Sequence, residues 1–205
     1  MTRSARSHVA VLLAAGGSER LGHPKQLLTR DGEPLVHRTA RLMAETGPRR
    51  LLVVLGARRD AVAAALGDIA CEQVVNQDWQ HGRASSLHAV ARTLSGEDAP
   101  VLLCACDQPA LTFKHLASLL SGAATSMSGC AATVHGDVPG VPAVVPGAWF
   151  AQVDGVQGDA GFGAGLRALP RHAVHLLDAP ELQLDIDTPD DLRRARAAGL
   201  LDAPG

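Results

Sequence analysis

The chain has 205 residues, 46% of them hydrophobic and 20% charged, which fits one domain with a packed core and excludes wholesale disorder. Its formal net charge of −2 disfavours nucleic acid as the main partner. No stretch approaches the roughly 20 apolar residues of a membrane span, and the first residues lack the apolar segment of a signal peptide, so we expect a cytoplasmic protein with no membrane partner.

The chain up to residue 121 alternates apolar runs of strand length with stretches of helical spacing. Asp60 and Thr112 stand where the N-caps of two helices are expected. In chain order the patterns predict a strand over residues 8–14, a helix over 34–46, a strand over 51–55, a helix over 61–66, a strand over 72–75, a helix over 84–94, a strand over 101–105 and a helix over 113–121. This order requires crossover connections, and therefore a largely parallel sheet with helices on both faces.

From residue 122 onward, small residues, glycine and proline become frequent. In chain order we expect strands near a sheet edge over residues 131–134 and 143–145, a glycine-rich loop over 155–165, a strand over 173–177, and a closing helix over 191–198 that follows Thr188 and Pro189. The predicted fold is a single α/β domain over residues 1–205, with three layers and a mostly parallel sheet. Residues 1–7 are expected to form a flexible tail.

The four cysteines form no CxxC pair. Cys104 and Cys106 alternate within an apolar run, which predicts two small core residues on one face of a strand. A zinc site is the alternative interpretation, but the sequence offers no second pair at ligand spacing.

The segment AAGGSERLGHPK, residues 14–25, follows the first apolar strand. Its glycines let backbone N–H groups approach a ligand, although any tight turn between strand and helix could carry such a pair. The segment lacks the GxGxxG of dinucleotide-binding folds and the GxxxxGK[ST] of P-loop enzymes. Arg20 and Lys25 stand in a fixed Gly/Pro frame instead, and a planar guanidinium with a compact ammonium suits a triphosphate.

This segment resembles the signature L-A-A-G-x-S-x-R-[ML]-G-x-P-K of nucleotidyltransferases with a GT-A-like fold. Within them, PKQLL and NQDWQHGRASSL are similar to the molybdenum cofactor nucleotidyltransferases, above all the cytidylyltransferases. The resemblance implies that the loop surrounds a nucleoside triphosphate and that Arg20 and Lys25 neutralise its charge. The nucleotide-binding residues it implies are Leu13, Ala14, Ala15, Gly16, Gly17, Ser18, Arg20, Lys25, Asn76, Gly82, Ser85, Ser86 and Asp107.

Two aspartates are candidates for a metal site. Asp107, in CACDQPAL, comes at the end of the long apolar strand predicted over residues 101–105, and ligands of parallel sheets bind at the carboxyl ends of the strands. An aspartate there is equally common as a helix cap or a turn residue. In LQLDIDTPDDL, Asp187 follows Asp185 at a spacing of two and precedes a helix, whose dipole would also favour an acid there. The resemblance assigns Asp107 and Asp187 to one Mg²⁺, with Asp107, Arg20 and Lys25 as catalytic residues; it leaves Asp185 without a role.

The other two segments implied by the resemblance lie further from the phosphates. NQDWQHGRASSL is expected to line the base and sugar, whereas the plain interpretation is a loop with Ser85 or Ser86 as a helix cap and Trp79 as a packing residue. The acceptor is expected at Gly140, Pro142, Gly158 and Asp159. The resembled enzymes carry a G-D-x-G-A-R stretch, which residues 158–163 match only in part. Phe162 and Gly163 stand in place of its Ala and Arg, and the next cation along the chain is Arg167.

The function implied is Mg²⁺-dependent transfer of CMP from CTP to the phosphate of a molybdopterin-type acceptor, with release of pyrophosphate. A molybdoenzyme that receives the cofactor is the expected protein partner. The alternatives are a guanylyltransferase, another nucleotidyltransferase that acts on a phosphorylated small molecule, and a non-catalytic chaperone that binds molybdenum cofactor.

Overall fold

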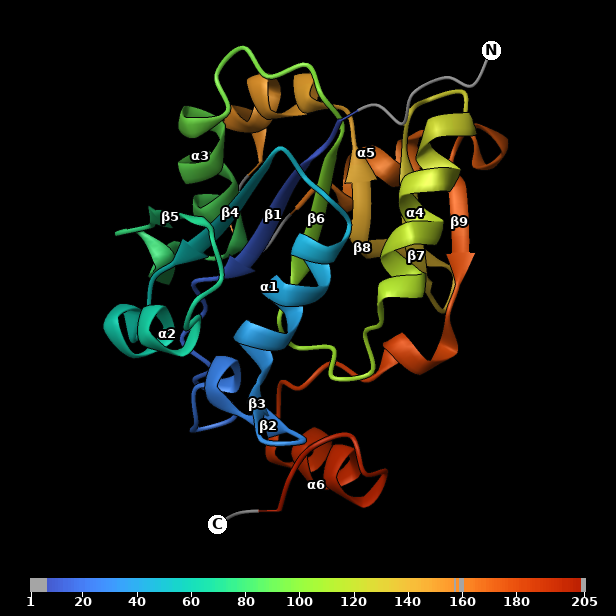
Figure 1. The fold of residues 1–205 in the computed structure, drawn as a ribbon. Helices are drawn as coiled ribbons and strands as arrows, with labels where there is room; N and C mark the ends of the chain where they lie inside the picture. The colour runs from blue at the N-terminus through green and yellow to red at the C-terminus, as the bar shows by residue number, and fades with distance from the viewer. Residues whose placement is uncertain (1–6, 157, 159–160, 204–205) are drawn as a thin grey trace.

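A seven-stranded sheet forms the middle layer of the protein, and its strands are the apolar runs of the sequence (Figure 1). The computed structural model describes residues 7–203 except 157, 159 and 160, so the tail predicted over residues 1–7 lies outside the described residues apart from Ser7. In chain order the strands are β1 (Val9–Ala14), β4 (Arg50–Leu55), β5 (Glu72–Val75), β6 (Val101–Ala105), β7 (Ala131–His135), β8 (Val138–Val145) and β9 (His175–Asp178).

The strand order across the sheet is β5-β4-β1-β6-β8-β7-β9. β8 runs antiparallel to both of its neighbours, and the remaining pairs are parallel. The predicted fold class, a single α/β domain with a mostly parallel sheet, is therefore confirmed. Because β1 and β6 are parallel neighbours with Leu13 opposite Ala105, the loops that follow them leave the sheet side by side.

Helices cover both faces of the sheet, and one further helix, α6, lies apart from them. In chain order the described helices are α1 (Leu35–Glu45), α2 (Arg59–Ala65), α3 (Arg83–Thr93), α4 (Phe113–Thr125), α5 (Gly163–Ala168) and α6 (Pro189–Ala197). Shorter 3₁₀ segments are η1 (Lys25–Leu27), η2 (Trp79–His81), η3 (Gly147–Gly155), η4 (Arg171–Ala173) and η5 (Pro180–Gln183), and a small hairpin joins β2 (Thr29–Arg30) to β3 (Glu33–Pro34). None of the described helices has the length and apolar character needed to cross a membrane.

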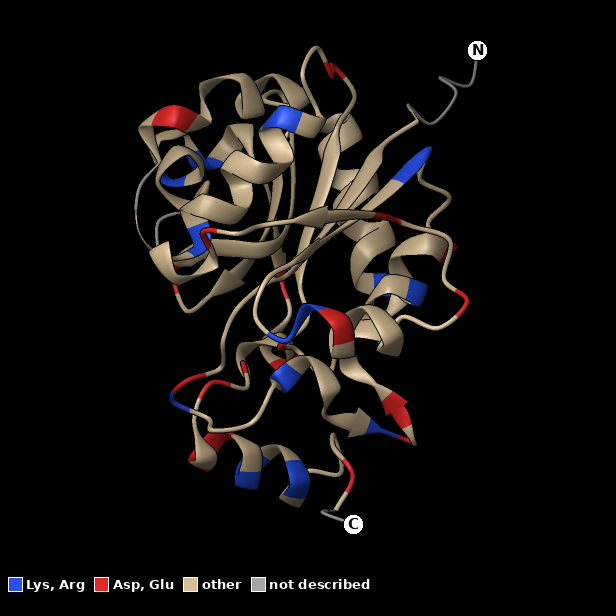
Figure 2. Cartoon of the chain, turned by 90° about the vertical axis from the view of Figure 1, so that its left-hand side faces the viewer, with Lys and Arg blue, Asp and Glu red and all other residues tan. Residues whose placement is uncertain are grey.

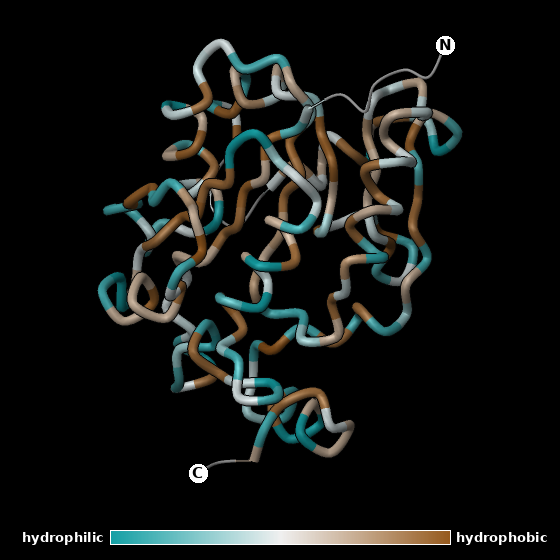
Figure 3. The backbone as a smooth tube through the Cα atoms, viewed as in Figure 1, coloured by the Kyte–Doolittle hydropathy of each residue, from teal (hydrophilic) through white to brown (hydrophobic). Residues whose placement is uncertain are grey.

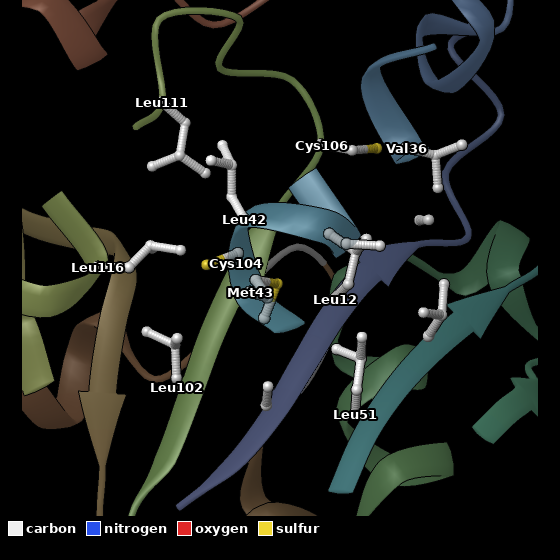
Figure 4. Packing of buried hydrophobic residues seen from close by; sticks show 14 of the residues in the cluster. Leu12, Val36, Leu42, Met43, Leu51, Leu102, Cys104, Cys106, Leu111 and Leu116 are labelled. Atoms are coloured by element: carbon white, nitrogen blue, oxygen red, sulfur yellow. The ribbon is translucent and has the colours of Figure 1, made fainter. Parts of the chain in front are cut away.

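Alternation along β1 divides the core between the two faces. Leu12 packs with α1, α2 and α4, whereas Val11 packs with α3, η3 and α5. Cys104 and Cys106 are buried among leucines of the first face, as the core interpretation of these residues predicts (Figure 4). The hydropathy colours of Figure 3 follow this arrangement, with brown strands inside and teal loops outside.

α6 lies below the sheet, away from the other helices (Figure 1). A separate apolar cluster holds it there, in which Leu192 and Ala195 pack with Leu21 of the glycine loop and with Ile186. Thr188 caps the helix in a capping box with Asp191, and Pro189 stands in its first turn. This packing brings the end of the chain to the loop that follows β1.

Two elements extend beyond their predicted bounds. α4 continues through the small residues to Thr125, because Gly122 leaves room for the ring of His175, which lies 2.2 Å from the position of a Cβ there. β8 runs through the Pro/Gly-rich stretch and lies inside the sheet rather than near its edge. A register shift opposite Thr133 accommodates its prolines, and the Thr133 hydroxyl donates to Pro142 O at 2.9 Å.

Three local predictions were wrong. The N-cap of α2 is Arg58, in a left-handed conformation, and Asp60 lies in the first turn. The predicted glycine-rich loop ends in helix α5, because Leu166 anchors that segment in the core. The predicted strand over residues 173–177 begins only at His175, after η4.

Candidate active site

The loop after β1 closes on itself through side-chain contacts. Ser18 adopts a left-handed conformation, and its carbonyl accepts from the backbone N–H groups of Leu21 and Gly22 at 3.1 and 3.0 Å. Its hydroxyl accepts from Lys25 N at 3.1 Å. The buried Gln26 amide donates to Ala14 O and Gly16 O at 3.0 and 2.7 Å, which fixes the chain from the end of β1 to the first glycine of the pair. Sequence reasoning missed Gln26, although PKQLL contains it.

Trp79 packs against this loop. A Cβ on Gly17 would lie 2.7 Å from its ring, and a Cβ on Gly56 would lie 2.7 Å from its Cβ, so both positions need glycine. The ring also packs on the core of the second face, which confirms Trp79 as a packing residue. The backbone of the loop therefore rests on a rigid aromatic support.

Lys25 joins two carboxylates that are far apart in the sequence. Its Nζ donates to Asp107 Oδ2 at 2.7 Å and to Asp187 Oδ1 at 2.8 Å, so the two acids converge on a single point. Arg20 donates to the second oxygen of Asp187 at 3.0 Å. In Figure 2, blue and red segments lie next to each other between the sheet and α6, while the strands are largely tan.

Burial differs across this cluster, and neighbouring charges shift the pKa values of Lys25 and Asp187 against the effect of burial. The side chains of Lys25 and Asp107 are each 17% exposed, whereas those of Asp187 and Arg20 are 40% and 71% exposed. Burial alone would lower the pKa of Lys25, but the charges and hydrogen bonds of Asp107 and Asp187 outweigh it and raise that pKa. Burial would raise the pKa of Asp187, but Lys25 and Arg20 hold it below its ordinary value. Both shifts favour the charged forms of Lys25 and Asp187.

A third acid, Asp185, lies behind the cluster. The backbone N–H of the residue between the two acids, Ile186, donates to Asp107 O at 2.9 Å, which fixes this segment beside the end of β6. Burial and the negative charge of Asp107 raise the pKa of Asp185 to about 6, against a hydrogen bond from Gln108. Asp185 Oδ1 is buried without a hydrogen-bond partner. Asp185 and Asp187 would lie on one face if a strand continued through them, but residues 184–187 do not form a strand.

Gln108, which sequence reasoning also missed, ties the segments of the site together. Its side chain is buried, and Nε2 donates to Val141 O of β8 and to Leu182 O of η5, each at 3.2 Å. It therefore links the residue after Asp107 to the stretch that contains Gly140 and Pro142 and to the segment that leads to Asp187. Its only signal in the sequence was its position between Asp107 and Pro109 in CACDQPAL.

Replacing Gln108 by leucine is expected to lower stability and to raise the metal concentration needed for half-maximal activity. The carbonyls of Val141 and Leu182 would lose a buried donor, which costs about 1–3 kcal/mol, and the segments that carry Asp107 and Asp187 would separate. Urea unfolding and a metal titration measure the two effects. Gln152→Leu, at an exposed position of η3, is the matched control. An unchanged metal requirement in Gln108→Leu would show that this side chain only stabilises the fold.

The donor set fits a hard divalent cation. No group of three or more His, Cys, Asp and Glu side chains among the described residues forms a complete metal site. Mg²⁺, however, commonly takes only one or two carboxylates and completes its shell with phosphate oxygens and water. Asp107 and Asp187 already converge, and Lys25 Nζ stands between them as a cation. A metal bound to the same oxygens would compete with this ammonium.

The segment predicted to line the base forms its own polar network. Asn76 is buried and donates through Nδ2 to Ser85 Oγ and Ser86 Oγ at 2.8 and 3.0 Å, and Ser85 donates to Gly82 O at 2.7 Å. Gly82 has a φ of 87° and precedes α3, so it turns the chain into the helix. The structure brings these four predicted residues together.

The predicted acceptor residues lie in two places. Gly140 and Pro142 belong to β8, where His135 Nε2 donates to Val141 O at 2.8 Å, close to the Gln108 contact. Gly158 lies instead beside the segment predicted to line the base, since its carbonyl accepts from Ala84 N at 2.9 Å. Asp159 lies outside the described residues.

The chain is similar to a known family and to several known proteins. Residues 10–176 match the family described as MobA-like NTP transferase domain. Nicotine blue oxidoreductase from Paenarthrobacter nicotinovorans is 34% identical over 198 residues, covering 90% of this chain and 94% of that protein. The crystal structure of the Mycobacterium tuberculosis rv0371c homolog from Mycobacterium sp. strain JC1 has a TM-score of 0.76 at 29% identity, covering 94% and 96%. Rv0371C from M. tuberculosis H37Rv in complex with manganese has a TM-score of 0.70 at 28% identity, covering 92% and 97%.

Proposed function

The chain belongs to the MobA-like NTP transferase domain family, and we propose that it transfers CMP from CTP to the phosphate of molybdopterin or its molybdenum-bearing form, releasing pyrophosphate. The observation that carries this proposal is the convergence of Asp107 and Asp187 on Lys25, beside a glycine loop fixed by Gln26. The choice of CTP rests on the resemblance of residues 12–28 and 76–90 to the cytidylyltransferases.

In the proposed reaction, an oxygen of the acceptor phosphate attacks the α-phosphorus of CTP. The bond from that phosphorus to the oxygen bridging to the β-phosphate breaks, and pyrophosphate leaves. A divalent cation, proposed to be Mg²⁺ held by Asp107 and Asp187, supplies positive charge to the phosphate oxygens. Because the acceptor phosphate is already anionic, the reaction needs no general base, and catalysis rests on positioning and electrostatic stabilisation.

The residues of the chain divide this work. Lys25 leaves the two carboxylates and binds the triphosphate, which restores its charge pairing with phosphate oxygens. Arg20, largely exposed at the mouth of the loop, offers its guanidinium to the same phosphates. The backbone of Gly16 and Gly17 approaches the nucleotide without interference from a Cβ, and the Asn76–Ser85–Ser86 network faces the base and sugar.

The expected nucleotide preference is CTP over GTP. Pyrophosphate release is measured with each of the four nucleoside triphosphates, with and without molybdopterin, at fixed Mg²⁺. We expect release with CTP only when molybdopterin is present. Dominant release with GTP would instead identify a guanylyltransferase, and nucleotide binding without release would identify a chaperone.

A second arm of the experiment addresses the relative that is named an oxidoreductase. The same protein is incubated with NADH or NADPH and nicotine blue, and the loss of nicotinamide absorbance is followed. We expect no oxidation above the rate without protein. Oxidation together with an absence of pyrophosphate release would overturn the proposed transfer reaction.

A further inference from the structure

A groove lies between helix α6 and the segment that follows the glycine loop, and its volume is about 340 Å³. Figure 1 shows α6 next to the β2–β3 hairpin, below the sheet. Sites for small molecules commonly have volumes of about 300–1,000 Å³, so this groove has room for a compact ligand. We call it the α6 groove, and the residues that line it are His23, Pro24, Leu27, Leu28, Leu192 and Arg196.

Two sets of contacts hold the walls of the α6 groove in place. Before the helix, Asp187 accepts a hydrogen bond from Lys25 Nζ at 2.8 Å. After the helix, the carboxylate of Asp202 accepts from the backbone N–H groups of Asp31 and Gly32, each at 2.9 Å. The helix is therefore tied to the opposite wall both before its first residue and after its last, which keeps the groove formed between them.

The surface of the α6 groove combines apolar side chains with basic ones. Leu27, Leu28 and Leu192 supply its apolar part, whereas His23 and Arg196 supply N–H donors from the two walls. No acidic side chain is among the described residues that line it. This combination fits a ligand that joins an anionic group to an apolar body.

The guanidinium of Arg196 is oriented for an anion. Its Nε donates to the carbonyl oxygen of Asp202 at 3.0 Å, which leaves both terminal nitrogens without a partner among the described residues. The two other arginines of α6 pair with the acids of its first turn, at 2.7 and 3.6 Å. The carboxylate of Asp202 is bound by the turn of the hairpin. Arg196 can therefore donate two N–H groups in parallel to one anionic group.

We propose that the α6 groove binds a small apolar anion, such as an aromatic carboxylate or sulfonate, and that this ligand opposes binding of the metal and CTP. The anionic group pairs with Arg196, and the apolar body covers Leu28 and Leu192. Pro24 and Leu27 flank Lys25 along the chain, so a ligand on them favours the arrangement in which Lys25 holds the two carboxylates. A metal bound to the same oxygens competes with Lys25. Only this opposition rests on the proposed function.

Binding is tested with anilinonaphthalene sulfonate, an apolar anion whose fluorescence rises when it leaves water. We expect saturable binding to the wild type, and a Kd about 10- to 100-fold higher for Arg196→Gln, because a charge-assisted contact is lost. Glutamine can still donate to the carbonyl of Asp202, so α6 is expected to stay in place. Arg193→Gln removes an exposed cation of the same helix outside the groove and is expected to leave Kd unchanged. No saturable binding to the wild type, or equal Kd for the wild type and Arg196→Gln, would overturn the proposal.

A neutral probe separates recognition of the anion from general apolar binding. Phenylnaphthylamine has the same rings without the sulfonate, and we expect the wild type and Arg196→Gln to bind it equally. If Arg196→Gln weakened binding of both probes by the same factor, Arg196 would only shape the groove, which contradicts the proposed ion pair.

The effect on the metal is measured by titrating Mn²⁺ into the protein with CTP, in the presence and absence of the sulfonate probe. We expect the probe to raise the Mn²⁺ concentration at half-saturation several-fold in the wild type and not in Arg196→Gln. An unchanged Mn²⁺ requirement would overturn the opposition between the two sites. None of these measurements needs molybdopterin or turnover. A protein that binds the probe through Arg196 but releases no pyrophosphate would therefore refute the proposed function and still support the α6 groove.

Discussion

Replacing Lys25 by methionine is expected to slow nucleotidyl transfer about 100- to 1000-fold, the usual effect of removing one charge-assisted contact to a transition state. Methionine keeps the length of the apolar stem and removes only the ammonium. The measurement is kcat from pyrophosphate release at saturating Mg²⁺, CTP and acceptor. A rate within a few-fold of the wild type would contradict a role for Lys25 at the phosphates.

The same substitution also leaves Asp107 and Asp187 facing each other without the cation between them. We therefore expect Lys25→Met to melt at a lower temperature than the wild type, and to regain more stability than the wild type does when Mg²⁺ or Mn²⁺ is added. Arg20→Met is the matched control, because among the described residues its 71% exposed side chain pairs with Asp187 alone, and such an exposed ion pair contributes little to stability. Equal responses of the two variants to metal would contradict the shared carboxylate site.

Replacing Asp107 by asparagine is expected to reduce metal-dependent turnover about 1000-fold or more. A metal ion contributes several kcal/mol to the stabilisation of the developing charge, and each 1.4 kcal/mol is a factor of ten in rate. The amide keeps the shape of the side chain and can still accept a hydrogen bond from Lys25. The protein is therefore expected to remain folded, with weakened binding of the metal–nucleotide complex.

Asp187→Asn is expected to be less damaging, because the side chain of Asp187 is 40% exposed whereas that of Asp107 is 17% exposed. Asp190→Asn, at the exposed first turn of α6 where Asp190 pairs with Arg193, is the control for loss of an acid without loss of the site. Calorimetric titration with Mn²⁺ and CTP ranks the three variants. Wild-type turnover in Asp107→Asn would leave only a structural role for this residue at the end of β6.

The sequence predicted the elements that rest on local patterns. Continuous apolar runs located β1, β4 and β6 within one residue, and Thr112 and Thr188 both begin helices, since capping depends on a few neighbouring residues. The convergence of Asp107 and Asp187 followed from a resemblance, because no local pattern relates residues so far apart. The distances to Lys25 required the tertiary structure.

The sequence failed where a distant contact overrides local composition. Gly122 continues α4 because a ring from β9 packs on it, and the prolines of β8 are accepted inside the sheet through a register shift. The sequence did not predict that the side chains of Gln26 and Gln108 are buried and hydrogen-bonded, because their partners are backbone carbonyls of other segments. In the sequence, Arg167 was only the first cation after Gly163, which stands where the resembled stretch has an arginine. Its position over Gly163 depends on how α5 is packed.

The most direct test of the account is diffraction from crystals grown with Mn²⁺ and a non-hydrolysable CTP analogue, with data collected at a wavelength where manganese scatters anomalously. We predict an anomalous peak bound by carboxylate oxygens of both Asp107 and Asp187, with Lys25 Nζ displaced onto a phosphate oxygen. A peak elsewhere, or Lys25 still bridging the two carboxylates while the nucleotide is bound, would contradict the metal-dependent mechanism at this site.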